Sequence, residues 1–138
     1  MLSAWAAAVS AALAGGMPTV ATVLIAVVAV LHGFFLILEM FLWEKPFGRK
    51  TFGMKADQAA ATAVLAKNQG LYNGFLSAGL AWSIALGIEG AAHADDVATF
   101  FLACVVVAGA YGAATVNPRI FVVQGVPALL ALGAVWAL

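Results

Sequence analysis

Long apolar runs separated by short polar stretches dominate the hydrophobic pattern of this 138-residue chain. A helix needs roughly 20 predominantly apolar residues to cross the hydrocarbon core of a bilayer. Four runs meet or approach that length, at about residues 19–43, 69–88, 97–116 and 119–138, and the last is barely long enough. The pattern predicts an all-α fold, an integral membrane four-helix bundle in a single transmembrane domain.

The first 17 residues, MLSAWAAAVSAALAGGM, are apolar but too short to span a bilayer. They lack the basic start of a usual signal peptide. We expect a short apolar helix that lies at the interface or packs on the bundle. A cleaved leader is the alternative interpretation.

The composition excludes a soluble domain. Hydrophobic residues make up 65% of the chain and charged residues 9%, and the mean hydropathy is +1.08. Net charge is zero and no basic stripe interleaves with aromatic residues, so nucleic acid is not an expected partner. Cys104 is the only cysteine, which excludes an intrachain disulfide and a cysteine-based zinc site.

The distribution of positive charge predicts the orientation. The loop at 44–68 holds Lys45, Arg49, Lys50, Lys55 and Lys67, and Arg119 precedes the fourth span, whereas the loop IEGAAHADD has no Lys or Arg. Basic loops stay in the cytoplasm, so both termini are expected outside.

Within the basic loop, KPFGRKTFG is rich in turn-forming residues, and Asp57 is well placed to cap a helix. That helix is either a separate interfacial helix or an extension of the second span. Further along, Gly70, Gly74 and Ala78 form a small-residue stripe that lets another helix approach closely, within the chain or in a homo-oligomer.

Two ionisable residues interrupt the first apolar run. His32 and Glu39 are seven residues apart, close to two helical turns, so they are expected on one helix face with Trp43 continuing the stripe. His32 falls near mid-membrane and Glu39 nearer the cytoplasmic end. An ionisable residue inside a membrane is a functional-site hypothesis by default.

The other three spans bring hydrogen-bonding side chains to the same cytoplasmic depth, whereas the outer half is almost wholly apolar. An unpaired polar group in lipid costs several kcal/mol, so these side chains must find partners or line a wet cavity. The predicted ligand-binding residues are Trp43, Asn68, Gln69, Tyr72, Asn73, Tyr111 and Gln124.

These residues favour a site for a small lipophilic molecule that enters from the bilayer. His32 and Glu39 are the candidate catalytic residues, because an imidazole and a carboxyl can serve as an acid–base pair for an isomerase- or cyclase-like reaction. No cofactor motif is present, and two ligands seven residues apart do not make a compact metal chelate, so neither a cofactor nor a metal is expected. A structural or accessory subunit and a proton-coupled transporter are the alternatives.

Three stretches carry a resemblance to a known family. LHGFFLILEMFLWEKPFGRKTFGM, LAKNQGLYNGFLSAGLAW and VAGAYGAATVNPRIFVVQGVPALLAL resemble the small bacterial membrane proteins grouped as domain of unknown function 1304. The resemblance covers about residues 27–138, and NQGLYNGF and LEMFLW are its specific motifs. It implies four helices in the bacterial inner membrane, crossing it several times, and no established activity. The first 17 residues look like an addition to the family pattern.

Overall fold

The computed structural model describes residues 16–137, and every regular element in that range is helical. The helix predicted for residues 1–17 therefore lies outside the described residues except for its last two positions. The described chain forms two compact units, one from residues 16–28 with 79–137 and the other from residues 29–78. We call them unit 1 and unit 2 and describe each by itself.

Three helices in the described range are long and apolar enough to cross a membrane. The first consists of α2 (Thr19–Ile37) and the π-helical turn η1 (Leu38–Leu42), and the others are α4 (Ala56–Ile88) and α5 (Ala94–Thr115). These helices confirm the all-α fold, and each contains most of one of the first three predicted apolar runs. Pro18 directly precedes the first helix, and its carbonyl accepts hydrogen bonds from the backbone N–H and the hydroxyl of Thr22.

The fourth apolar run forms a shorter helix. It comprises the π-helical turn η2 (Phe121–Gly125) and α6 (Val126–Ala137). This run is helical as predicted, but Phe121–Ala137 falls short of the roughly 20 residues that a membrane span usually takes. A fourth crossing of the membrane stays a prediction.

The basic loop differs from expectation because most of it is helical. KPFGRKTFG was expected to form turns, and this prediction is wrong: Pro46–Phe52 is the helix α3. Pro46 supplies a favourable first residue, and Gly53 ends the helix in the left-handed conformation at φ 65°, with its N–H pointing to the carbonyls of Arg49 and Lys50. The turn-forming residues therefore mark the two ends of a helix.

The helix predicted after this loop is an extension of the second span. Helix α4 runs without a break from Ala56 to Ile88. Asp57 lies inside the first turn of α4 and not before it, so it does not cap the helix as predicted. Its carboxylate instead interacts favourably with the positive end of the helix dipole.

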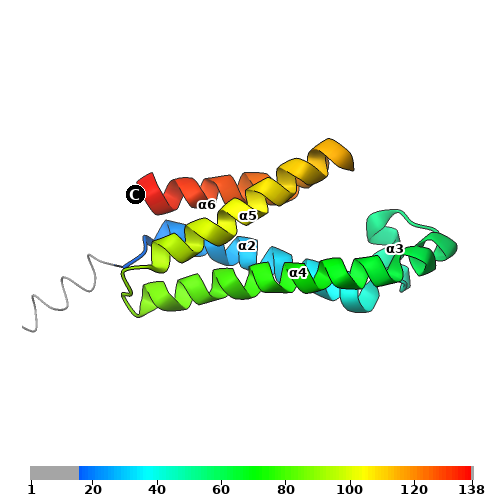
Figure 1. Cartoon of the computed structure of the whole chain (residues 1–138), viewed down its shortest axis with the longest axis horizontal. Coiled ribbons are helices and arrows are strands. Elements are labelled where there is room, and N and C mark those ends of the chain that lie inside the picture. The colour runs from blue at the N-terminus through cyan, green and yellow to red at the C-terminus, as the bar shows by residue number, and fades with distance from the viewer. Residues whose placement is uncertain (1–15, 138) are drawn as a thin grey trace, which may run out of the picture. The chain divides into compact units, whose positions relative to one another are not determined.

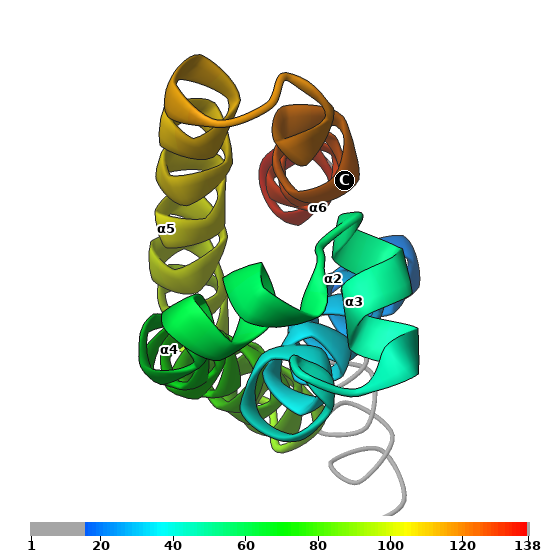
Figure 2. The same ribbon diagram turned by 90° about the vertical axis from the view of Figure 1, so that its right-hand side faces the viewer.

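In unit 1, α5 packs on η2 and α6 in an antiparallel hairpin (Figures 1 and 2). The turn between them forms at Asn117, whose side-chain oxygen accepts a hydrogen bond of 2.9 Å from the N–H of Arg119. Gly109 permits close backbone approach, because a Cβ there would lie 3.1 Å from the nitrogen of Gly125. At the other end of the hairpin, Trp136 Nε1 donates to Thr99 Oγ1 over 2.8 Å.

Candidate functional site

Unit 2 is a close pairing of the first helix with α4. Gly70 and Gly74 make it close: a Cβ on Gly70 would lie 2.7 Å from Met40 Cγ, and one on Gly74 would overlap the side chain of Leu36. Two members of the predicted small-residue stripe thus serve packing within the chain, whereas Ala78 is exposed. The homo-oligomer stays a prediction.

A carboxyl–amide hydrogen bond lies beside this glycine contact. Asn73 Nδ2 donates to Glu39 Oε2 over 2.7 Å. Asn73 is only 5% exposed and Glu39 is partly buried. Both residues belong to the predicted site, and the structure brings them into direct contact from two different helices.

His32 lies in α2, before Glu39 in the chain, and is completely buried. Its ring meets Phe35 edge to face at a centroid distance of 6.1 Å. One turn away, Ser77 Oγ donates to the carbonyl of Ala29 over 2.8 Å and sits 3.3 Å from where a Cβ on Gly33 would be. The π-helical turn η1 begins at Leu38, between His32 and Glu39, so the α-helical spacing does not hold over the whole interval and their shared helix face stays a prediction.

Trp43 has structural partners on both sides. Its Nε1 donates to Thr62 Oγ1 over 3.1 Å, and its ring packs against Phe52 at a centroid distance of 4.7 Å. Trp43 therefore joins α3 to the first turns of α4. Thr62 was not predicted, although a threonine at the same membrane level as an interfacial tryptophan is a usable signal.

Replacing Trp43 by phenylalanine is expected to lower the free energy of unfolding by about 0.5–1.5 kcal/mol, the usual net value of one hydrogen bond. The ring contact with Phe52 is largely kept in this variant. Unfolding by sodium dodecyl sulfate in mixed micelles would measure the change. Thr62→Val should cost a similar amount, and the double variant should cost no more than either single one; additive effects would contradict the bond.

The remaining predicted residues lie at several places. In unit 2, Asn68, Gln69 and Tyr72 are exposed on α4, and Tyr72 packs edge to face on Phe75. In unit 1, Tyr111 is 72% exposed on α5 and Gln124 is partly buried in η2. Because Tyr111 and Gln124 belong to unit 1, their place in one site with Glu39 stays a prediction.

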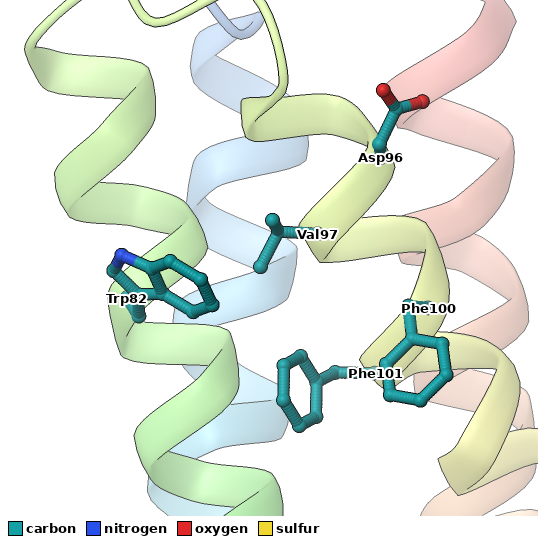
Figure 3. A pocket seen from close by; sticks show the side chains of 5 residues that line it. All are labelled: Trp82, Asp96, Val97, Phe100 and Phe101. Atoms are coloured by element: carbon teal, nitrogen blue, oxygen red, sulfur yellow. The ribbon is translucent and has the colours of Figure 1, made fainter.

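Unit 1 carries an apolar groove that the sequence analysis missed (Figure 3). It has a volume of about 330 Å³ and is open. Figure 3 shows Trp82 on α4 facing Val97 and Phe101 on α5, and Gly79 leaves room for the Phe101 ring. The sequence does contain a signal for this groove. Trp82 and Phe101 lie at similar distances before and after the turn that joins α4 to α5, which places them at a similar level of the two helices. The full lining is Trp82, Asp96, Val97, Phe100 and Phe101.

Chemically, the Glu39–Asn73 pair keeps two oxygen atoms that can accept hydrogen bonds, for example from a hydroxyl group. One oxygen of the carboxyl and the oxygen of the amide take no part in the bond between them, and no other residue of the described range hydrogen-bonds to either side chain. No group of three His, Cys, Asp or Glu side chains in residues 16–137 is arranged to hold a metal ion.

Comparisons with known proteins place the chain in a family. It is 28% identical to the uncharacterized protein YpaA of Lactococcus lactis over 117 residues, which cover 83% of this chain and 95% of that protein. No solved structure matches the chain. Residues 26–136 match the family described as protein of unknown function DUF1304, close to the range that the sequence motifs indicated. The chain is therefore a member of the DUF1304 family.

Proposed function

We propose that this protein lies in the bacterial inner membrane and binds a small lipophilic molecule at Glu39, Asn73 and His32. The observation that carries the proposal is the 2.7 Å hydrogen bond between Asn73 and Glu39, which joins two helices long and apolar enough to cross a membrane. A carboxyl in a membrane span is costly and is usually retained for a function. Helices long and apolar enough to cross a membrane support the location.

The chemistry of the pair indicates the kind of ligand. Asn73 holds one carboxyl oxygen of Glu39 in place, and the other oxygen is available to a hydroxyl group. The rest of the ligand would be apolar, since the neighbours on the first helix are Leu36, Met40 and Leu38. Under the positive-inside rule the site lies in the cytoplasmic half of the membrane.

The same residues would allow acid–base chemistry without a cofactor. A carboxyl and an imidazole can donate and accept protons during an isomerisation or a cyclisation of a lipophilic substrate.

The test is modification of Glu39 in proteoliposomes by dicyclohexylcarbodiimide, a lipophilic reagent that reaches carboxyls from the bilayer. We expect an adduct on Glu39, located by mass spectrometry and absent from Glu39→Gln. Dodecanol, an apolar chain with one hydroxyl, should slow the reaction by occupying the site. Glu44→Gln is the matched control, because it removes an exposed carboxyl five residues away and should leave the adduct unchanged. If Glu39 does not react, or if dodecanol has no effect on its rate, the proposal is wrong.

A further inference from the structure

Positive charge is concentrated around α3. Five of the six Lys and Arg residues of the chain lie between Trp43 and Asn68. Lys45, Lys50 and Lys55 are all exposed there. Two aromatic residues accompany them, since Phe47 is 56% and Phe52 is 38% exposed. We call Lys45, Phe47, Lys50, Phe52 and Lys55 the basic platform.

The platform is held in a fixed position in unit 2. Helix α3 packs back on η1. Gly48 is buried against the carbonyl of Leu42, where any Cβ would overlap the backbone. Trp43 then holds α3 through Phe52 and holds α4 through Thr62. These contacts place the platform directly after Leu42, where the first apolar helix ends.

The charges of the platform have no counterions within the described chain. Neither Glu44 nor Asp57 forms an ion pair with any of the three lysines in residues 16–137. The neighbouring Arg49 also lacks a partner there for its buried Nε atom. Contact with solvent is sufficient to explain exposed lysines, but it does not explain the exposed Phe47 ring beside them, whereas Phe52 packs on Trp43.

Both features fit the interface of a bilayer. Aromatic rings are favourable at headgroup level, and lysine side chains reach outward to phosphate groups from that depth. Anionic lipids attract basic segments next to a membrane span. We propose that the basic platform binds the headgroups of anionic phospholipids, with the Phe47 ring inserted among the adjoining acyl chains. This inference does not depend on a ligand at Glu39.

The test uses the full chain, stripped of lipid in a neutral detergent and titrated with phosphatidylglycerol or phosphatidylcholine. Native mass spectrometry would count the bound lipids, and we expect phosphatidylglycerol to bind more tightly. Lys45→Gln/Lys50→Gln/Lys55→Gln should weaken its binding on the order of 100-fold, because each lysine contributes about 1 kcal/mol and every 1.4 kcal/mol is a factor of ten. Equal binding of the two lipids, or no effect of the triple variant, would overturn the proposal.

A charge-matched variant distinguishes the effect of the three platform lysines from the effect of the net charge of the chain. The triple variant lowers the net charge of the chain from 0 to −3. Adding Glu89→Gln, Asp95→Asn and Asp96→Asn at the opposite end of α4 and the start of α5 returns it to 0. Binding should stay weak in this six-fold variant; recovery would show that overall charge governs binding and would overturn the platform.

A change in an aromatic residue distinguishes a membrane lipid from a soluble anion as the ligand of the basic platform. Phe47→Ser keeps every lysine, and Phe47 makes no aromatic contact with Trp43. It should weaken phosphatidylglycerol binding several-fold. Unchanged binding in Phe47→Ser, or competition by soluble glycerol phosphate as effective as that by the lipid, would show that the Phe47 ring takes no part and would overturn the proposal.

Discussion

Replacing Gly48 by alanine is expected to detach α3 from the end of the first helix. The new Cβ would overlap the carbonyl oxygen of Leu42, and a backbone atom cannot move aside as a flexible side chain can. Overpacking typically costs about 1–3 kcal/mol, and contact with backbone places this variant at the upper end. A lower thermal denaturation temperature in detergent and faster proteolysis within residues 44–56 would show the effect.

Gly133→Ala is the matched control for this variant. Gly133 is also helical, but a Cβ there meets nothing within 4 Å. Alanine is favoured over glycine inside a helix by up to about 1 kcal/mol, so Gly133→Ala should be neutral or stabilising. The two glycine-to-alanine changes are therefore expected to have opposite signs. If Gly48→Ala were as stable as Gly133→Ala, that result would contradict the close contact between Gly48 and the carbonyl of Leu42.

The helices could be predicted because the bilayer imposes length and hydropathy together. Boundaries such as Pro18 and Asn117 carried their own chemical signals. Helix α3 was missed because the same residues, Pro46 and Gly53, favour both turns and helix ends. The π-helical turns were missed for another reason, since η1 and η2 have no distinctive residue pattern and depend on how the helix packs.

The candidate site was only partly predictable. Hydropathy identifies Glu39 and Asn73 as misplaced polar residues, and depth counting places both near one end of their spans. Their contact required that the first helix and α4 come together at Gly70, which the small-residue stripe indicated without naming its partner. The sequence does not distinguish Thr62, because a threonine in a helix can donate to a carbonyl of its own helix; Thr62 does donate to the carbonyl of Gln58 and also accepts from Trp43.

The second large effect is expected from breaking the bond between Glu39 and Asn73 on one side. Asn73→Leu leaves the Glu39 carboxyl without its donor, and Glu39→Leu leaves the buried amide without its acceptor. Each variant should lose about 1–3 kcal/mol, the cost of a buried polar group with no partner. Glu39→Gln should be far milder, because its side-chain oxygen can still accept from Asn73.

Replacing both partners tests whether the bond exists for stability alone. Glu39→Leu/Asn73→Leu leaves no unpaired polar group at this point, and exchanging both partners for apolar groups of similar shape is often nearly neutral. We therefore expect the double variant to unfold close to the wild-type temperature in detergent. If the pair is a binding site, dodecanol should raise the denaturation temperature of the wild type and have no effect on the double variant. A double variant that is folded and still responds to dodecanol would place the ligand elsewhere, and the open groove between Trp82 and Phe101 would then be the next place to examine.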